Sequence, residues 1–429
     1  MNTNILDFGA ISGGQTLCTQ AIQAAIDACH ISGGGRVTVP AGTYLTGSIW
    51  LKSHVELHLE HGSVLKASEN LDDYNPEDAY EQNWANPTTE KWVGKHLLLC
   101  VEQTDVALTG TGVLDGSGDA FMGEPRHFSN YCWRYGLSVA KDEEKLRPGQ
   151  LICFVESQNI TVTDVTLRNL PCWGLFLHGC DVATIRGVKV FSPPNFGNSD
   201  GIDIDACRFV TISDCIIDTG DDAIAIRGCA MRIKDKQHPC EYITVSNCVL
   251  GSSSSVFRIG VGQGVVRHIR ISNITATRGG PLVTFMTGYR GVGFVPIEDV
   301  HFSHISATNI ATPIEVEERS GAHVKNVTFE DVYVEAYIGC RIYTDNVDTI
   351  QDLTLRNFHY VLVEGPPALN RYDKATRGTK LLHIQRVNGL TLDNVRIDTT
   401  PALMEPFTDG IFGFEECTNV VLRNVTPAE

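Results

Sequence analysis

The chain has 429 residues, of which 42% are hydrophobic, so it is long enough to bury a continuous core. Its formal net charge of −17 argues against nucleic acid or an anionic membrane surface as a partner. An acidic polysaccharide remains compatible with this charge, because a local basic cleft would be enough to bind one. No stretch is long and apolar enough to span a bilayer, so no membrane partner is expected.

The N-terminus and the cysteines bear on localisation. Residues 1–10 contain no basic region and no apolar run, so no signal peptide is predicted. The 14 cysteines form no CxxC pair, which argues against a zinc site, and several lie in strand-like apolar segments. We therefore expect buried, reduced thiols and a cytoplasmic location, whereas a chain trimmed of its signal would be secreted.

The first predicted element is an amphipathic helix over residues 19–29. Three glycines, Gly33 to Gly35, follow it, and residues 36–40 then have the pattern of a short strand. A stack of strands exposes its core at the end unless another element covers it. We therefore expect residues 1–50 to hold an N-terminal cap, made by this helix, and the first strands.

The next segment, from about residue 71 to 149, contains few strand patterns and many polar and aromatic residues. We interpret it as loop-rich insertions beside a cleft. No linker or shift in composition marks a second domain. The sequence thus predicts one domain over residues 1–429, in which residues 150–429 form repeated coils.

The second half of the chain repeats a six-residue pattern: apolar, any, apolar, polar, small or polar, apolar. Successive copies start roughly 23 to 37 residues apart, a spacing typical of solenoids. The polar residues near the end of each copy suit a tight turn with one left-handed residue. The copies are Ile160–Val165, Ala183–Val188, Val210–Cys215, Ile243–Cys248, Ile269–Ile274, Val300–Ile305, Val327–Val332, Leu353–Phe358, Leu390–Val395 and Val420–Val425.

Each copy predicts one coil of a parallel β-helix. The alternation has a period of two and is rich in Val, Ile and Thr, which indicates strands and excludes a helical repeat. A leucine-rich repeat is excluded because its fixed leucine and asparagine spacing is absent. A single coil cannot bury its apolar face, but stacked coils bury it against one another. The predicted fold class is therefore all-β, a parallel β-helix with an N-terminal capping helix.

Three aspartates in the middle of the repeats are the strongest functional signal. Asp200, and the pair Asp221 and Asp222, each precede small residues and then an apolar strand. On neighbouring strands these carboxylates would lie about 5 Å apart along the stack. Unpaired carboxylates that close repel each other, which raises the pKa of at least one of them. One proton donor beside ionised partners is what the hydrolysis of a glycosidic bond requires.

Both members of the Asp221 and Asp222 pair can reach one cleft only if the chain bends there, since adjacent residues of a strand point in opposite directions. Gly220 would allow such a bend. Asp203 and Asp205 are more simply explained as turn-capping carboxylates or as residues of the other face. A calcium site is an alternative interpretation of the cluster, because grouped carboxylates suit a hard cation.

Several segments resemble glycoside hydrolase family 28, the polygalacturonase and rhamnogalacturonan hydrolase family, with this chain as a divergent member. The resemblance runs through most of the chain, including the 21-residue offset between Asp200 and Asp221. The segments that carry it are Asp7–Ala10, Val39–Tyr44, Gly112–Gly116, Arg147–Pro148, Pro171–Trp173, Asn198–Gly201 and Gly220–Asp222.

The resemblance implies a right-handed parallel β-helix and an inverting hydrolase. Carried over by position, Asp221 would be the general acid, and Asp200 and Asp222 would hold and activate the attacking water. Inverting hydrolysis needs this division, because an acid must protonate the leaving oxygen while a base acts on water at the opposite face.

The chain departs from the family at two positions. Where the family carries a histidine that tunes the acid, this sequence has Ser255. Where the family carries Arg-Ile-Lys, which binds the galacturonate carboxylate, this sequence has residues 283–287, Val-Thr-Phe-Met-Thr. A uronate without a cation would leave its carboxylate unpaired, at a cost on the order of 1–3 kcal/mol. Ordinary polygalacturonase activity is therefore not expected.

Other residues are candidates for binding the substrate. Arg227 and Arg258 could meet a carboxylate at a different subsite, or could equally be surface arginines paired with acids. Tyr289 follows the altered stretch and could line the same face. Trp173 could stack on a sugar ring and His178 could hydrogen-bond a hydroxyl, although both could instead be packing residues. Ser255 completes the predicted binding set.

The sequence predicts an inverting, exo-acting glycoside hydrolase for a pectin-related oligosaccharide, with a neutral or deoxy sugar at the cleaved bond, as in rhamnogalacturonan. The alternatives are a polygalacturonase with altered uronate binding and a β-helix that binds carbohydrate without catalysis. A lyase or epimerase is disfavoured, since no suitably placed Lys or Arg base or metal site is evident. We expect an oligosaccharide as partner, no cofactor, no metal, and a monomer or weak homo-oligomer.

Overall fold

The computed structural model describes residues 1–78, 91–122, 145–288, 293–317, 321–344, 346, 348–365 and 380–427. These residues fall into two compact units. The first contains the described residues up to 221 together with 230–238, and the second contains 222–229 and the described residues from 239 onward.

The first unit is built from short parallel strands, three to a coil. The strand β13 pairs with β16, and β16 with β19, so that Ile160 lies beside Ala183 and Ala183 beside Val210. The strands are β1 (Asn2–Asn4), β2 (Gly35–Val39), β3 (Gly42–Thr46), β4 (Ile49–Trp50), β5 (Val55–Leu59), β6 (Ser63–Ala67), β7 (Trp92–Val93), β8 (Leu98–Val101), β9 (Thr104–Gly110), β10 (Val113–Asp115), β11 (Arg147–Pro148), β12 (Ile152–Val155), β13 (Gln158–Thr163), β14 (Thr166–Arg168), β15 (Leu175–His178), β16 (Asp181–Arg186), β17 (Lys189–Phe191), β18 (Ile202–Asp205), β19 (Arg208–Ser213) and β20 (Ile216–Thr219).

The second unit continues the pattern with longer strands. Ile243, Ile269 and Val300 are register partners in succession, and Val327, Leu353 and Leu390 extend the same row. Its strands are β21 (Ile224–Gly228), β22 (Cys240–Ser252), β23 (Phe257–Gly262), β24 (Val266–Met286), β25 (Ile297–Glu317), β26 (Val324–Ala336), β27 (Cys340–Ile342), β28 (Ile350–Leu362), β29 (Leu382–Gln385), β30 (Val387–Asp398), β31 (Phe412–Glu415) and β32 (Val421–Pro427).

The helices are few and short. The longest one in the described residues, α1 (Thr19–Ile31), buries Ile22, Ala25, Ile26 and Cys29. The others are η1 (Ile5–Phe8), η2 (Leu71–Asp73), α2 (Asp119–Met122), η3 (Ala230–Arg232) and α5 (Pro401–Met404).

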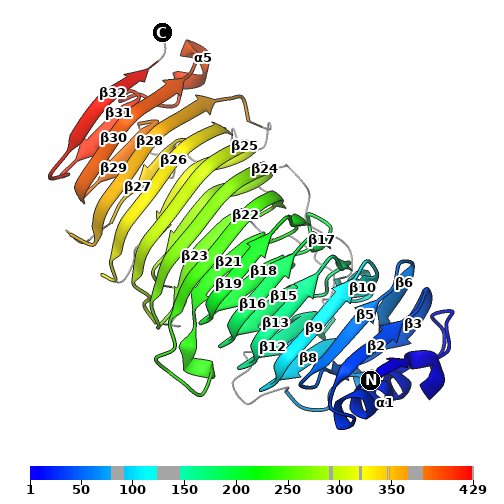
Figure 1. The fold of residues 1–429 in the computed structure, drawn as a ribbon. Helices are drawn as coiled ribbons and strands as arrows, with labels where there is room; N and C mark the ends of the chain where they lie inside the picture. The colour runs from blue at the N-terminus through cyan, green and yellow to red at the C-terminus, as the bar shows by residue number, and fades with distance from the viewer. Residues whose placement is uncertain are drawn as a thin grey trace. The chain divides into compact units, whose positions relative to one another are not determined.

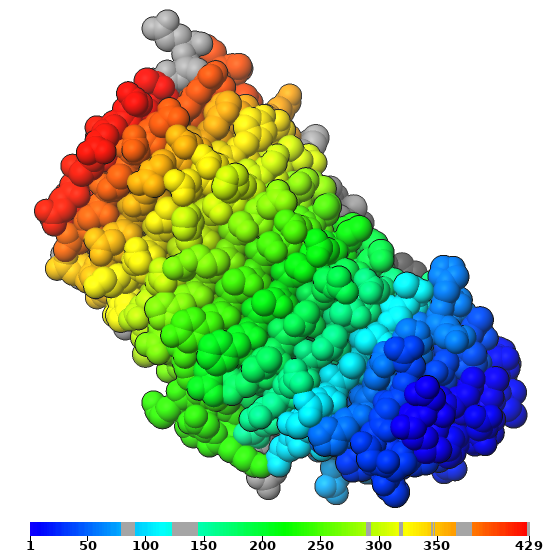
Figure 2. Space-filling view, in the orientation of Figure 1, coloured from blue at the N-terminus to red at the C-terminus, as the bar shows by residue number. Residues whose placement is uncertain are grey.

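The capping role of α1 is visible in its contacts. Gln23 on α1 donates to the carbonyl oxygen of Trp50 at 3.0 Å and accepts from its N–H at 2.8 Å. In Figures 1 and 2, the blue N-terminal segment that contains α1 lies against the strands β2, β3 and β5. The predicted parallel β-helix with an N-terminal capping helix is therefore confirmed.

Each copy of the six-residue repeat contains one left-handed residue and directly follows another. The fifth residue of every copy has positive φ, as the turn prediction required, and it is Asn, Asp, Gly or His. The residue directly before every copy also has positive φ, which the sequence did not indicate, because Val182, Phe209 and Tyr242 occupy it in three copies. β-branched and aromatic residues rarely adopt this conformation, so the stacked coils impose it.

The predicted loop region from about residue 71 to 149 contains a regular coil. The strands β8, β9 and β10 form it, and β8 and β9 pair with β12 and β13 of the next coil. In β9 only Val106 and Leu108 point into the core, so polar residues obscured the alternation. Residues 79–90 and 123–144 of this region lie outside the described residues.

Every cysteine among the described residues has a free thiol, and all except Cys417 are buried, as predicted. A membrane-spanning helix is absent from the part of the chain that the structure describes.

The core of the second unit contains a column of phenylalanines. The rings of Phe302 and Phe329 stack with centroids 4.8 Å apart, and Phe285 and Phe358 pack edge-on against them. Parallel register explains the stacked pair, because Phe302 and Phe329 are partners at one repeat position and lie directly above one another.

Replacing one of these rings should destabilise the protein strongly. We expect Phe329→Ala to lower the free energy of unfolding by about 3–5 kcal/mol, because it leaves a cavity in a fully buried site. Phe294→Ala, at a position that is 59% exposed, is the control and should change it by less than about 0.5 kcal/mol. Urea denaturation followed by circular dichroism measures both; similar losses would contradict the assigned core.

Candidate active site

Asp200 and Asp221 each lie in the short segment before a buried strand. Asp200 precedes β18 and Asp221 precedes β21, and both residues are 5% exposed. The Oδ2 atom of Asp221 accepts a hydrogen bond from the backbone N–H of Asn198 at 2.9 Å. Asn198 has φ of 55°, a left-handed conformation that asparagine tolerates well. This turn therefore fixes one oxygen of Asp221.

Position 220 requires glycine because a Cβ atom would not fit there, and not because of its φ angle. A Cβ atom there would lie 2.1 Å from the carbonyl oxygen of Phe196 and 2.7 Å from Oγ of Ser199. The N–H of Gly220 donates to that same Ser199 hydroxyl at 3.0 Å. Close packing is therefore the reason for glycine at this position, whereas the sequence had suggested conformational freedom for a bend.

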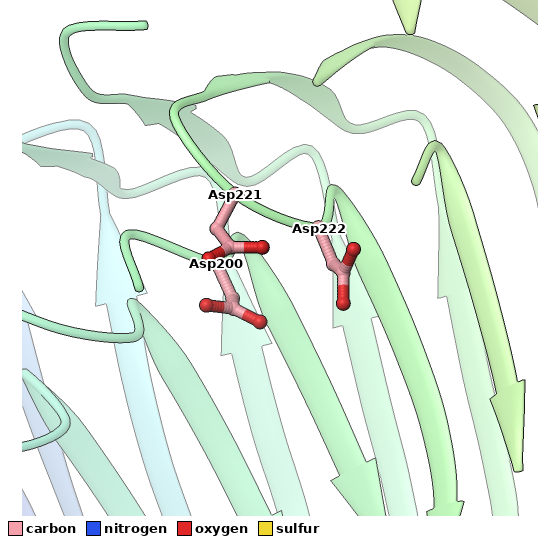
Figure 3. A group of neighbouring side chains, drawn as sticks. All are labelled: Asp200, Asp221 and Asp222. Carbon is pink, nitrogen blue, oxygen red and sulfur yellow. The ribbon is translucent and has the colours of Figure 1, made fainter. Parts of the chain in front are cut away.

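The three predicted aspartates are brought together. One carboxylate oxygen from each of Asp200, Asp221 and Asp222 lies within 4.8 Å of the other two, close to the spacing predicted from the stack. Figure 3 shows the three side chains on the same side of the backbone. Asp221 and Asp222 lie in the irregular segment before β21, where neighbouring side chains need not alternate.

Asp222 forms a two-point ion pair with Arg258 of β23. The Nε–H of Arg258 donates to Oδ2 of Asp222, and Nη2 donates to Oδ1 at 3.0 Å. The N–H of Ser255 also donates to Oδ1, at 2.9 Å. Burial by itself raises the pKa of Asp222, but Arg258 and these hydrogen bonds outweigh burial and hold the pKa below its usual value. The pKa of Asp222 is therefore not raised by repulsion from the neighbouring carboxylates, as the sequence had suggested for at least one of the three.

The two positions where the sequence departs from the family pattern lie around this ion pair. Ser255 shares a hydrogen bond of 2.9 Å with Thr284, through their hydroxyl groups. Arg258 is the register partner of Thr284, and its Nη1 lies 3.5 Å from the sulfur of Met286. The stretch without the cationic pair thus packs against a cation supplied by the previous coil.

Arg147 anchors the turn that carries Asn198. Its side chain is 1% exposed, and its Nη1 donates to the carbonyl oxygen of Pro171. Nη2 donates to Oδ1 of Asn198 at 2.9 Å. A planar guanidinium presents its donors in a rigid fork, so it can hold acceptors on two turns in a fixed geometry, whereas an ammonium group is a point charge on a flexible stem. Sequence reasoning quoted Arg147 only as part of a motif and missed this contact, although a lone arginine before a proline was the available signal.

The predicted sugar-binding residues Trp173 and His178 lie on the coil before Asp200. The Trp173 ring is 5.9 Å from that of Trp92 and 5.3 Å from that of Phe176, edge-on to the latter. His178 is 2% exposed, with its ring 5.3 Å from that of Phe176. These four aromatic side chains form a row whose packing role is established, and their contact with a sugar stays a prediction.

The remaining candidates lie on two strands, apart from one that the structure does not describe. Arg227 lies on β21 and is buried. Asp203 and Asp205 lie on β18 and are buried too, at register positions beside Phe176 and His178. The position of Asp203 is therefore within a strand and not in a turn. Tyr289 lies outside the described residues.

Within the part of the chain that the structure describes, the cluster of Asp200, Asp221 and Asp222 is also a possible cation site. Its donor set consists of hard carboxylate oxygens, which suit Ca²⁺. However, both oxygens of Asp222 already accept hydrogen bonds from Arg258. A calcium ion would have to displace this guanidinium or share its charge, so these residues fit a metal poorly.

Comparisons with known proteins show what the chain is similar to. A family model described as glycosyl hydrolases family 28 matches residues 29–339. A probable polygalacturonase of Vitis vinifera is 27% identical over 76% of this chain and 64% of its own. An exo-poly-alpha-D-galacturonosidase of Dickeya chrysanthemi is 29% identical over 56% of this chain and 44% of its own. The matches thus span less than two thirds of these relatives' length.

Solved structures show the same fold. A hyperthermoactive exopolygalacturonase of Thermotoga maritima superposes with a TM-score of 0.72 and 23% identity, over 92% of this chain and 91% of its own. A family 28 exopolygalacturonase of Yersinia enterocolitica gives a TM-score of 0.65 and 19% identity, over 99% and 77%. The predicted right-handed parallel β-helix is confirmed by this likeness.

Loss of the Arg258 charge should destabilise the protein in a pH-dependent manner. The pKa of Asp222 is lowered in the folded state, so the pair stabilises the fold above the ordinary aspartate pKa and this contribution is lost on acidification. We expect Arg258→Gln to cost about 3–5 kcal/mol near pH 7, because it leaves a buried carboxylate unpaired. The loss should shrink towards pH 3, where Asp222 of the variant is protonated.

Denaturant unfolding at several pH values measures this effect. The control is Arg356→Gln, which removes an exposed pair with Glu330 in the same unit and should cost less than about 1 kcal/mol. A loss for Arg258→Gln that does not vary with pH would contradict the role given to the ion pair.

Replacing Arg147 should release the Asn198 turn. We expect Arg147→Lys to lower the free energy of unfolding by about 1–3 kcal/mol, since buried carbonyl acceptors lose their donors. In a crystal structure of the variant, the distance from Asn198 N to Asp221 Oδ2 should exceed 3.5 Å. Arg168→Lys, at an exposed pair with Asp115, is the matched control. An unmoved turn in the first variant would disprove the anchoring role.

Proposed function

Because the chain belongs to glycosyl hydrolases family 28, we propose that it is an inverting glycoside hydrolase that acts on a pectin-related oligosaccharide. The observation that carries the proposal is the convergence of Asp200, Asp221 and Asp222 within 4.8 Å of one another. Buried carboxylates in such a group supply both the acid and the base of glycosidic hydrolysis.

The roles follow from the chemistry of inversion. Asp221 protonates the leaving oxygen as general acid, and the carboxylates beside it orient and activate the attacking water. The nearest oxygens are closer than the separation of about 6.5–9.5 Å that is usual between the two carboxyl groups of inverting enzymes. The anomeric configuration of the product is therefore the measurement that establishes the stereochemistry.

The surroundings of Arg258 support a neutral or deoxy sugar at the cleaved bond. The family's cationic pair is replaced by Thr284 and Met286, and the charge of Arg258 is already compensated by Asp222. A uronate carboxylate at this point would compete with Asp222 for the guanidinium. A rhamnogalacturonan-type oligosaccharide, with rhamnose at the cleaved bond, avoids that competition.

Exo action forms part of the same proposal. It is supported by two structurally similar proteins, both of which are exopolygalacturonases. The predicted closing loops within residues 71–149 lie largely outside the described residues, so they add no support. The expected cytoplasmic location and the monomeric or weakly oligomeric state also belong to the proposal.

A polygalacturonase with altered uronate binding is the second candidate. The names of the curated relatives favour it, since they include polygalacturonases and an exo-poly-alpha-D-galacturonosidase. In this case Arg227 or Arg258 would bind the uronate carboxylate.

A hydrolysis screen separates these candidates. Purified protein is incubated with polygalacturonate, rhamnogalacturonan oligosaccharides and neutral α- and β-glycosides, and the products are followed by NMR. Release of an inverted monosaccharide from a substrate other than polygalacturonate is the expected result. Efficient cleavage of polygalacturonate would favour the second candidate, and saccharide binding without any product would indicate a non-catalytic protein.

The general acid is tested by Asp221→Asn. We expect a loss of about 10²–10⁴-fold in kcat with saccharide binding retained, because the leaving oxygen no longer receives a proton. Asp218→Asn, at an exposed residue three positions earlier, is the control and should leave kcat unchanged. Near-normal activity of folded Asp221→Asn would rule out this residue as the acid.

A further inference from the structure

Asp200 and Asp222 are the two candidate bases, and the contacts of Asp222 bear on which of them takes the proton. Asp222 is 3% exposed and accepts hydrogen bonds from Nε and Nη2 of Arg258 and from the N–H of Ser255. Both of its oxygens are therefore engaged. Arg258 cannot release a proton in a protein, so its pairing with Asp222 persists through the catalytic pH range.

A carboxylate held in this way is a poor general base. To accept a proton from water, it must offer a lone pair to that water and must gain stability on protonation. Protonating Asp222 would instead leave the charge of Arg258 uncompensated in a site where its side chain is only 18% exposed. The lowered pKa of Asp222 agrees with this argument.

We infer that Asp222 serves as the fixed counter-ion of Arg258, and that Asp200 alone takes the proton from the attacking water. The inference rests on the proposed function and assigns a separate role to each carboxylate of the site. With Asp221 as the acid and Asp222 engaged, Asp200 is the remaining carboxylate of the cluster.

The step balances with these groups. The water oxygen bonds to the anomeric carbon as the bond from that carbon to the leaving oxygen breaks. The leaving oxygen takes the proton of the Asp221 carboxyl group, and the water proton passes to the Asp200 carboxylate. Asp222 remains ionised throughout. Arg258 is therefore a positioning residue that acts through Asp222 and keeps one negative charge fixed beside the reacting centre.

Neutral replacement of the whole pair tests the inference. The four variants are Asp200→Asn, Asp222→Asn, Arg258→Gln and the double variant Asp222→Asn with Arg258→Gln. In Asp222→Asn the guanidinium loses its counter-ion, so kcat should fall. The double variant has no uncompensated charge and keeps the shapes of both side chains, so its kcat should recover at least tenfold over Asp222→Asn. Asp200→Asn should lose about 10²–10⁴-fold.

Azide provides a readout that a purely structural role would not change. In Asp200→Ala, sodium azide should restore turnover and yield a glycosyl azide of inverted configuration, since azide attacks without needing a base. The double variant should show no such acceleration. Melting temperatures of all variants confirm that the comparison is between folded proteins.

Two results would overturn the inference. One is a folded double variant that is as inactive as Asp222→Asn, and the other is azide rescue at position 222 without rescue at position 200. Either one would identify Asp222 as the base. A wild-type protein that hydrolyses none of the screened substrates would overturn the proposed function itself, which separates the two failures.

Discussion

Two left-handed residues at every repeat, one directly before it and one at its fifth position, are the constraint on which the rest of the structure depends. They bend the chain at fixed intervals, so that each apolar strand returns to the same register as the strand one coil before. Asn, Asp and Gly adopt this conformation at low cost, and the stacked coils impose it on Val182 and Phe209. The side chains of both are about half exposed, which is how the corner accommodates them.

Fixed register explains how a chemically useful site arises from a repeated structure. In the first unit, the turn around Asn198 is held by Arg147 from one side and meets Asp221 on the other. Gly220 allows the backbone to approach Phe196 closely. Groups separated by many residues in sequence thus reach hydrogen-bond distance because the coils that carry them are stacked in register.

The electrostatics of the site depends on one partly buried cation, Arg258, in a strongly acidic protein. Arg258 neutralises Asp222, so carboxylates can gather in a dry region without all of them repelling one another. The same pairing makes the three aspartates chemically unequal. Asp222 stays ionised as the counter-ion of Arg258, and in our proposal Asp221 acts as the acid and Asp200 as the base. Substrate choice is linked to this pair, since a uronate would compete for the same guanidinium.

The sequence by itself determined the repeat, the β-helix, the capping helix over residues 19–29 and the grouping of Asp200, Asp221 and Asp222, because these follow from local alternation and turn chemistry. The coil at residues 98–115 was hidden by its polar outward positions. Only the tertiary structure decided that Arg258 pairs with Asp222 and that Arg147 reaches Asn198. Such contacts join segments 36 and 51 residues apart, and no local pattern records which partner a long side chain will meet.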